Sequence, residues 1–305
     1  MASEIVDVRG FLGKGSSIPV SYTKRDLILY ALGIGCDELR YVYEDNDSFA
    51  AFPTYPFVLS FKGTDADVVS FPSPAMMDGM VIPPLPGTRM GLDGERYLEV
   101  IRPLPAEAAQ LNMTNKLIGV HKRGKGALVE FETLITDAKD HAKVYTRIVS
   151  GSFLVGAKDF APESAGQSNS LAVPVPSRPA DSIVKVKVAP NQTQLYRLSG
   201  DYNPLHVDPA FAEMSGFKQP ILHGLCSAGF TAHAALREFG NNDPANFKAF
   251  RCRFAAPVIP GETLAVSMWE EGTRIVLQVS VEERDIVVVN NAYLELHHVK
   301  RASKL

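Results

Sequence analysis

The sequence has few cysteines, no long apolar run and no strong excess of either charge. Its three cysteines, Cys36, Cys226 and Cys252, are odd in number and show no metal-ligand spacing. We therefore expect reduced thiols rather than a disulfide framework. No stretch approaches the ~20 apolar residues of a membrane-spanning helix. A formal net charge of -3 gives no general attraction to nucleic acid. Neither a membrane span nor a nucleic-acid partner is expected.

The usual signatures of a bound cofactor are also missing. Gly13-Lys14-Gly15 has neither the spacing nor the following helix of a phosphate-binding loop. The histidines outside the motif described below show no metal-ligand spacing. We expect no metal and no separate cofactor.

What is present is typical of a globular chain with two similar halves. The 305 residues are 46% hydrophobic and 21% charged, which suffices for two domains with their own cores. Leu29–Gly33 can be aligned with Leu195–Ser199, which indicates a repeat of about half the chain. In that alignment Gly35 takes the place of Asp201, so the first copy lacks the acidic residue.

The chain divides at a stretch rich in proline, serine and alanine, residues 161–180, which is predicted to be an extended linker. Residues 1–160 precede it, with a helical run at Leu27–Leu32 and a strand candidate at Leu39–Tyr43. Residues 181–302 follow it. Further strand candidates are 97–103, 112–122, 127–136, 143–154, 182–188, 247–254, 263–270, 274–283 and 286–296. The predicted class is α+β, with a helix and an antiparallel sheet in each half.

An acid and an imidazole stand five residues apart in a segment that cannot be a helix. Asp201 and His206 follow Ser199-Gly200 and flank Asn203-Pro204. Proline fixes its own φ and moves Asn203 out of the helical region. The segment is therefore predicted to be a rigid loop that aims Asp201, Asn203 and His206 at one point.

A buried helix is predicted soon after this loop. His223-Gly224 opens a run, Leu225–Phe239, that is apolar or small on nearly every side until its last residues. The first N–H groups of a helix lack internal partners and carry the positive end of its dipole. The start of this helix thus suits a developing negative charge.

These residues resemble a known family. Leu195–His206 and Ile221–Leu225 are closely similar to the hydratase motif of MaoC-like, type-2 enoyl-CoA hydratases, and the match continues through Arg253-Phe254 and Pro257–Leu264. The resemblance implies a double hot-dog fold, each half a central helix wrapped by an antiparallel sheet. It also implies reversible hydration of trans-2-enoyl-CoA to (3R)-3-hydroxyacyl-CoA, in peroxisomal fatty-acid metabolism, by a homodimer.

The motif offers groups for each step of such a hydration. Asp201 and His206 are predicted to share the proton transfers, with the division between them left open. Asn203 is predicted to hold the water or orient its partners, although an Asx turn before Pro204 also explains it. The Gly224 N–H is the predicted donor to the thioester oxygen. His223 either shapes the pocket wall or caps the helix.

Coenzyme A, as part of the substrate, carries phosphates that need basic partners. Arg251 and Arg253 alternate along a predicted strand, and Lys122-Arg123 form a local basic cluster. These four are the candidate phosphate contacts, with ordinary surface charge as the alternative.

The first half is expected to serve the acyl tail. Pro53 and Pro56 interrupt the segment that occupies the place of the second half's helix. By resemblance this leaves a tunnel for a long or bulky acyl tail, which we expect Phe49–Phe71 and Met76–Met80 to line.

The last three residues, Ser303-Lys304-Leu305, match the peroxisomal import signal and predict recognition by the import receptor and a matrix location. Two other functions stay open. A hot-dog acyl-CoA thioesterase generally uses a carboxylate on or beside the central helix, and Leu225–Ala235 contains none. A non-catalytic acyl-CoA binding protein would not need both Asp201 and His206. Dehydration in the reverse direction uses the same groups.

Overall fold

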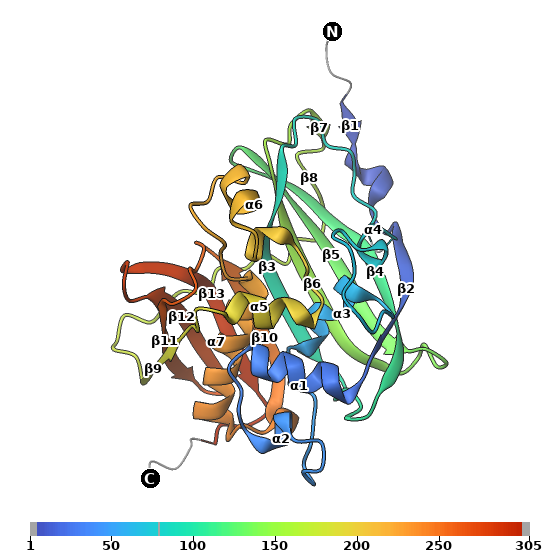
Figure 1. Cartoon of the computed structure of the whole chain (residues 1–305). Coiled ribbons are helices and arrows are strands. Elements are labelled where there is room, and N and C mark those ends of the chain that lie inside the picture. The colour runs from blue at the N-terminus through green and yellow to red at the C-terminus, as the bar shows by residue number, and fades with distance from the viewer. Residues whose placement is uncertain (1–4, 79, 301–305) are drawn as a thin grey trace.

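The computed structural model describes residues 5–78 and 80–300. Over these residues eleven strands join in one curved antiparallel sheet (Figure 1). Its order is β2-β4-β5-β6-β3-β10-β13-β12-β11-β9, with β8 paired to β4. The strands are β2 (Gly15–Tyr22), β3 (Met90–Val100), β4 (Ala109–Arg123), β5 (Gly126–Asp137), β6 (Val144–Val155), β8 (Ser164–Gly166), β9 (Ser182–Lys187), β10 (Phe247–Phe254), β11 (Thr263–Glu271), β12 (Arg274–Val281) and β13 (Ile286–Leu296). A separate parallel pair joins β1 (Val6–Asp7) to β7 (Phe160–Ala161).

The two halves of the sheet meet where β3 pairs with β10. Leu98 lies opposite Phe250, and Tyr97 opposite Arg251. Strands before β3 in the spatial order come from the first half of the chain, and strands from β10 onward come from the second. One sheet therefore runs through both halves, as expected for an α+β chain built from a repeat.

Helices cover the concave side of this sheet. They are α1 (Lys24–Gly33), α2 (Leu39–Val42), α3 (Leu59–Lys62), α4 (Pro74–Asp78), α5 (Gln192–Tyr196), α6 (Pro209–Met214) and α7 (Gly224–Gly240). Short 3-10 turns are η1 (Val8–Phe11), η2 (Tyr55–Val58), η3 (Arg197–Ser199), η4 (Pro204–His206) and η5 (Pro244–Asn246). Among the described residues no helix has the length and apolar character needed to cross a membrane.

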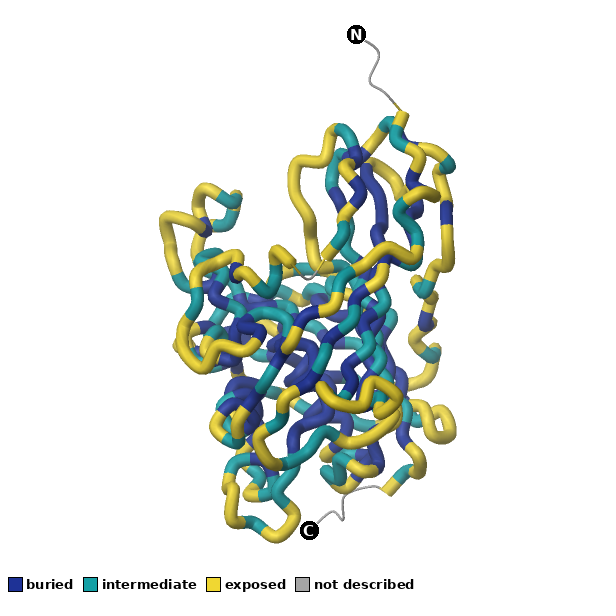
Figure 2. Tube along the Cα trace, turned by 90° about the vertical axis from the view of Figure 1, so that its right-hand side faces the viewer, coloured by how far each residue is buried: buried dark blue, intermediate teal, exposed yellow. Residues whose placement is uncertain are grey.

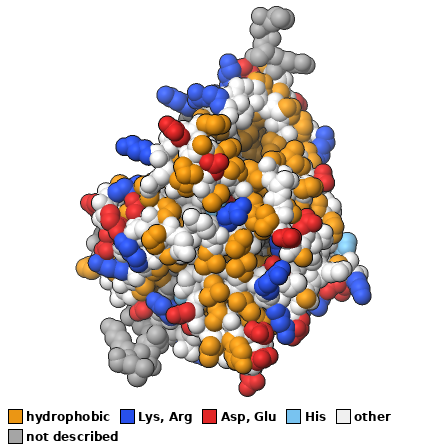
Figure 3. All heavy atoms as spheres, viewed as in Figure 1, with side chains coloured by type: hydrophobic (Ala, Val, Ile, Leu, Met, Phe, Trp, Pro, Cys, Tyr) orange, Lys and Arg blue, Asp and Glu red, His pale blue; other side chains and the backbone are white. Residues whose placement is uncertain are grey.

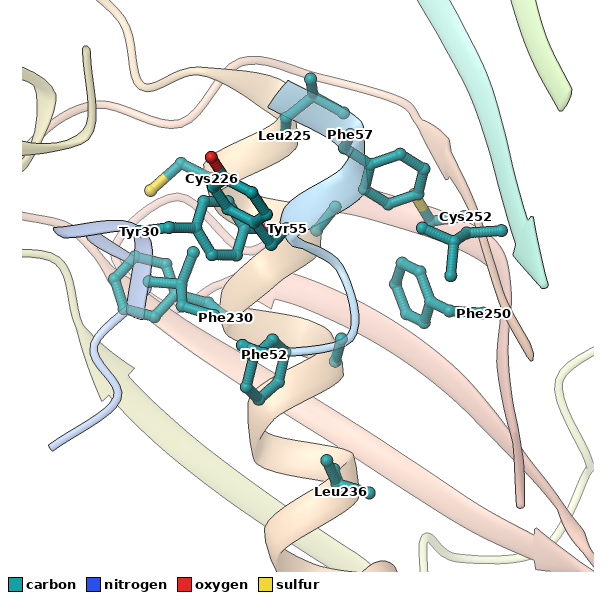
Figure 4. Close-up of a cluster of buried hydrophobic side chains, with 14 of the residues drawn as sticks. Tyr30, Phe52, Tyr55, Phe57, Leu225, Cys226, Phe230, Leu236, Phe250 and Cys252 are labelled. Carbon is teal, nitrogen blue, oxygen red and sulfur yellow. The ribbon is translucent and has the colours of Figure 1, made fainter. Parts of the chain in front are cut away.

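The longest described helix, α7, is the buried helix predicted from residues 225–239. It is buried on nearly every side and ends where Asn241 takes the left-handed conformation, its N–H donating to the Leu236 carbonyl. In the first half, η2 and α3 replace a long helix because Pro53 and Pro56 interrupt the segment. Figure 4 shows this segment lying alongside α7.

One hydrophobic core fills the space between the helices and the sheet (Figure 2). It contains α1, the 52–59 segment and α7 together, so residues of both halves share it. Tyr30 of α1 makes edge-to-face contact with Tyr55 and a tilted contact with Tyr196. The halves therefore stabilise each other and are not independently packed.

A polar contact also joins the halves. Glu38, just before α2, accepts hydrogen bonds from His233 Nε2 in α7 at 3.0 Å and from Cys36 Sγ at 2.9 Å. Burial alone would raise the pKa of Glu38, but the hydrogen bond and charge of His233 outweigh it and lower the pKa to about 2. These three side chains satisfy one another, so we interpret them as a structural link between α7 and the first half.

Two local predictions differ from the structure. Leu39–Tyr43 was expected to be a strand, but Leu39–Val42 is a helical turn with Tyr41 fully buried and Leu39 exposed. Five residues cannot separate a period of 2 from one of 3.6. The predicted linker is extended but lies against the sheet: Ser164–Gly166 pairs with β4, and Val173 packs on Trp269. The boundaries of the two halves stay a prediction.

Replacing Gly229 by Ala should destabilise the chain although alanine favours helices by ~1 kcal/mol. A Cβ at Gly229 of α7 would lie 2.3 Å from Ile34 Cγ2, inside the fully buried contact with the first half. We expect a loss of about 1–3 kcal/mol in the free energy of unfolding, measured with urea. Adding Ile34→Ala should recover part of it in a double-mutant cycle. Gly10→Ala, where a Cβ meets nothing within 4 Å, is the control.

Candidate active site

The loop that carries Asp201 is shaped by its own polar groups. Gly200 has φ 127°, a conformation that side-chain-bearing residues rarely adopt, and it turns the chain out of η3. The Asp201 carboxylate then accepts the N–H of Asn203 at 3.3 Å, and Asn203 Oδ1 accepts the N–H of Leu205 at 3.1 Å. Pro204 begins η4, which carries His206. Asn203 thus forms the Asx turn that was the alternative to a role in the site.

The structure brings Asp201, His206 and His223 together. One potential ligand atom of each lies within 4.8 Å of the others. The rings of His206 and His223 stack with their centroids 3.7 Å apart. His206 Nδ1 lies 2.8 Å from the Ile221 carbonyl, so Nδ1 carries the proton and Nε2 remains an acceptor. The imidazole is therefore oriented as a proton acceptor beside the Asp201 carboxylate.

His223 connects the loop to the central helix. Its Nε2 donates to the Asp201 backbone carbonyl at 3.2 Å, and its backbone is the N-cap of α7. Within the described part of the chain its buried Nδ1 has no hydrogen-bond partner. Of the two roles that the sequence left open, the structure shows the helix cap, made by the backbone of His223 and not by its side chain.

Burial sets the protonation of these groups. It raises the pKa of Asp201 to about 6, and the N–H of Asn203 and the charge of Arg96 only partly oppose it. Burial lowers the pKa of His206 to about 4, opposed by the Ile221 carbonyl. It holds the pKa of His223 well below its usual value, helped by the neighbouring His206. Near pH 7 the site contains a carboxylate and two neutral imidazoles.

Gly224 places a free amide next to this group. It is the first residue of α7, directly after His223. No acceptor among the described residues takes its N–H. A Cβ here would stand 3.4 Å from the Phe254 ring, so a glycine keeps the approach to the amide open. The geometry suits a hydrogen bond to an incoming oxygen.

A largely apolar cavity lies in the first half, between the 56–61 segment and strands β3 to β6. Phe57, Phe61, Met76 and Met80 line it, all from the segments expected to hold the acyl tail, and Arg96 also lines it. Met77, from the same segments, is 67% exposed and does not line it. Figure 3 shows a hollow bordered by hydrophobic side chains in the upper part of this face. Residue 79 lies outside the described residues.

A second cavity is lined by two of the four candidate phosphate contacts. Arg123 and Arg253 come from different halves and line it together with Phe254, the residue next to Gly224. The cavity therefore adjoins the start of α7.

The other two candidates are placed differently. Lys122 is exposed and pairs with Glu163 outside the cavity. Arg251 is buried and its guanidinium contacts Glu95 at 2.9 Å and the Asn169 carbonyl. The pairing of β10 with β3 is regular through both arginines, yet Arg253 is exposed while Arg251 is covered by Glu95 and the segment at Asn169. Of the four candidates, Arg123 and Arg253 therefore remain as predicted contacts of the coenzyme A phosphates.

Two charged residues near the site were not expected from the sequence. Asp93 and Arg96 of β3 form an ion pair at 3.0 Å. Asp93 lines the cavity with the two arginines, and Arg96 lines the apolar one. No motif marks them, since only the pairing of β3 with β10 brings them to the second half.

Comparison with known proteins decides the family. The model of the MFE-2 hydratase 2 N-terminal domain matches residues 20–156, and that of the MaoC like domain matches residues 172–291. A protein of Arabidopsis thaliana named "Enoyl-CoA hydratase 2, peroxisomal" is 35% identical over 289 residues, 88% of each chain. The chain belongs to the MaoC-like hydratase 2 family. The resemblance carried by Leu195–His206 is thereby confirmed.

Other relatives are longer or have solved structures. The mouse protein named "Peroxisomal multifunctional enzyme type 2" is 37% identical over 300 residues, 94% of this chain, and this chain spans only 38% of its length. A MaoC-like dehydratase from Phytophthora capsici is 38% identical, covers 96% of this chain and 98% of its own, and superposes with a TM-score of 0.89. A more distant structure, a Mycobacterium tuberculosis protein that is 15% identical with a TM-score of 0.57, is described as having a double hot-dog fold, which confirms the predicted fold.

Proposed function

We propose that this chain hydrates trans-2-enoyl-CoA thioesters to (3R)-3-hydroxyacyl-CoA, reversibly. One observation carries the proposal: the Asp201 carboxylate and the imidazoles of His206 and His223 lie together, and Gly224, whose N–H has no acceptor among the described residues, directly follows His223 at the start of α7. The name of the Arabidopsis relative supports the same reaction class.

Water adds across the C2–C3 double bond in this reaction, its hydroxyl to C3 and a proton to C2. Asp201 and His206 both offer lone pairs, so the water can be held between them and lose its proton to one of them. The electron pair of the double bond moves toward the thioester oxygen, where the Gly224 N–H and the start of α7 stabilise the charge. The proton is then returned to C2, and neither residue is changed overall.

The two cavities give the substrate a direction. The thioester oxygen at Gly224 lies next to Phe254, whose cavity contains Arg123 and Arg253 and suits the coenzyme A phosphates. The apolar cavity lined by Phe57 and Met76 suits the acyl tail. We assign Asn203 to holding the loop, through its Asx turn, as well as to the site.

Arg253→Ala combined with Arg123→Ala should raise KM for crotonyl-CoA about 10–100-fold, because two charge-assisted contacts to phosphate are lost. The same variant should treat the N-acetylcysteamine thioester like the wild type, since that substrate lacks phosphates. Lys122→Ala, an exposed lysine outside the cavity, is the control and should leave both unchanged. An equal loss of activity with both thioesters would show that the two arginines stabilise the fold and do not bind phosphate.

The reaction itself is tested by the products. Loss of the conjugated thioester absorbance, with a chiral 3-hydroxyacyl-CoA of R configuration, is the expected result. Release of free coenzyme A would identify the thioesterase alternative, and tight binding without product would identify a binding protein. Since three potential ligands lie together, turnover is also measured after dialysis against a chelator, and we expect no change.

We further propose a peroxisomal matrix location and a homodimer. Relatives named peroxisomal support the location. The predicted import signal, Ser303-Lys304-Leu305, lies outside the described residues. Removing these three residues should abolish import of a fluorescent fusion, and sedimentation should give twice the 33.2 kDa chain mass. Import of the truncated chain, or a monomer, would contradict the respective proposal.

A further inference from the structure

A serine, a histidine and a glutamate lie in contact in the first half of the sheet. Ser164 of β8 is exposed, whereas His121 of β4 and Glu130 of β5 are each only 2% exposed. Ser164 lies directly opposite His121 in the ladder of β4 and β8. Glu130 comes from the strand on the other side of β4, where it lies opposite Gly119. Three strands therefore bring a hydroxyl, an imidazole and a carboxylate together, which is the set of groups that serine hydrolases use.

The hydrogen bonds fix the tautomer of the imidazole. His121 Nε2 lies 3.1 Å from the Gln167 carbonyl oxygen, which only accepts, so Nε2 carries the proton. Nδ1 is therefore an acceptor, and the Ser164 hydroxyl donates to it at 2.7 Å. In this geometry a neutral histidine can take the proton of a nucleophilic serine.

The Glu130 carboxylate lies on the other side of the ring. Its Oε1 accepts the N–H of Asn169 at 2.7 Å. Its Oε2 is buried, has no hydrogen-bond partner among the described residues and lies 3.4 Å from His121 Nε2. A buried carboxylate oxygen without a donor is costly and needs an explanation. When His121 takes a proton it becomes an imidazolium, and Oε2 then stabilises the new charge.

A glycine makes room for this arrangement. A Cβ at Gly119 would lie 2.6 Å from His121 Nε2 and 2.2 Å from the Gln167 carbonyl oxygen. A larger residue would therefore displace the ring or the segment that fixes its tautomer. Because Gly119 lies opposite Glu130, the place of the ring beside the carboxylate depends on this one residue.

The backbone of Ser164 offers a hydrogen bond to a developing oxyanion. Lys122 donates its N–H to the Glu163 carbonyl, one pair along the ladder. Hydrogen-bonded and open pairs alternate between antiparallel strands, so the N–H of Ser164 points away from β4. No acceptor in the other described segments takes it. The N–H of the nucleophile itself serves as an oxyanion donor in serine hydrolases.

We propose that Ser164, His121 and Glu130 form a second reactive centre, at which small carboxylic esters acylate the Ser164 hydroxyl and the acyl group is then hydrolysed. Ser164 Oγ bonds to the ester carbonyl carbon while its proton passes to His121 Nδ1. The bond from that carbon to the alcohol oxygen breaks, and the alcohol leaves with the proton from His121. Water then attacks in the same way, which releases the carboxylic acid and restores the serine. Nothing is oxidised or reduced.

The wild-type protein is tested with a fluorophosphonate, which forms a covalent bond with activated serines, and the labelled peptide is identified by mass spectrometry. We expect Ser164 to be the labelled residue. The rate of labelling should fall about a hundredfold or more in His121→Gln, which lacks the base. In Glu130→Gln it should fall about tenfold, because charge stabilisation is lost while the Gln167 carbonyl still fixes the tautomer. Hydrolysis of 4-nitrophenyl acetate should follow the same order and be lost in Ser164→Ala.

Ser168→Ala is the matched control. Ser168 is also exposed and lies four residues along, but its hydroxyl accepts the Ser170 N–H and contacts no imidazole among the described residues. This variant should be labelled at Ser164 at the wild-type rate. Since His121 is buried, the Tm of His121→Gln is measured first. If that variant does not fold, the labelled residue of the wild type and the loss of hydrolysis in Ser164→Ala decide.

The proposal is wrong if Ser164 of the wild type stays unlabelled, or if folded His121→Gln is labelled as fast as the wild type. The three side chains then only hold residues 164–169 on the sheet. Neither result bears on the hydratase function, because the two sites share no residue. Ser164→Ala should hydrate crotonyl-CoA at the wild-type rate. Release of free coenzyme A that persists in Ser164→Ala would come from the site at Asp201 and not from Ser164.

Discussion

Asp201→Asn should lower kcat for crotonyl-CoA by about 10²–10⁴-fold, because an amide cannot take the proton of the attacking water. His206→Gln should cost a similar factor, since it removes the Nε2 acceptor that the Ile221 carbonyl orients. Steady-state assays at pH 7.5 measure both. In the double variant, the loss of kcat should be smaller than the product of the two single losses, because the two groups act on one water.

The pH dependence identifies which group limits activity at low pH. With the pKa of Asp201 raised to about 6, wild-type kcat/KM should fall as the pH drops through about 6. The pKa of His206, at about 4, lies too low to cause this limb. The residual activity of Asp201→Asn should not fall as the pH drops through about 6. If this fall persists in the variant, a group other than Asp201 causes it.

Loss of folding is not expected to explain the effect. The folded pKa of Asp201 is raised, so this carboxyl contributes stability below its unfolded pKa of about 3.8, and that contribution is lost as the pH rises through about 6. At pH 7 the buried, ionised carboxylate of Asp201 lowers the free energy of unfolding, and the neutral amide of Asn does not. Asp201→Asn should therefore have a Tm at least equal to wild type, and a markedly lower Tm would make the activity loss uninformative about catalysis.

The catalytic loop could be predicted because its shape depends on nearby residues. Gly200 permits the turn, Pro204 excludes a helix, and the Asn203 side chain bonds the backbone two residues on. Similarly, α7 could be predicted from an apolar run that leaves no polar face. Both predictions depend only on residues that are close to one another in the sequence.

What depends on distant pairing could not be predicted. Asp93 and Arg96 reach the site only because β3 lies beside β10 in a register that no local pattern fixes. Arg251 resembled Arg253 in sequence, yet Arg251 is buried against Glu95 and the Asn169 carbonyl, both distant in the sequence, while Arg253 lines a cavity with Arg123. Contacts between residues far apart in the sequence therefore decide which of two similar residues is structural and which lies at a cavity.

Met76→Trp should separate long from short substrates. Met76 lines the apolar cavity, and an indole there would occupy the space of several methylene groups of the tail. Each buried methylene contributes ~0.8 kcal/mol, about fourfold in affinity. We expect kcat/KM for a decenoyl or longer thioester to fall about a hundredfold, while crotonyl-CoA changes less than about threefold. A chain-length series from four to sixteen carbons measures the effect.

The neighbouring residue provides the matched control. Met77 belongs to the same short helix, α4, but is 67% exposed and lines no part of the cavity. Met77→Trp adds the same indole one position along and should leave every chain length unaffected. If both variants lose activity equally, the effect comes from α4 itself and not from the cavity. If Met76→Trp slows all chain lengths alike, the cavity does not hold the tail, and the acyl chain leaves the site by another path.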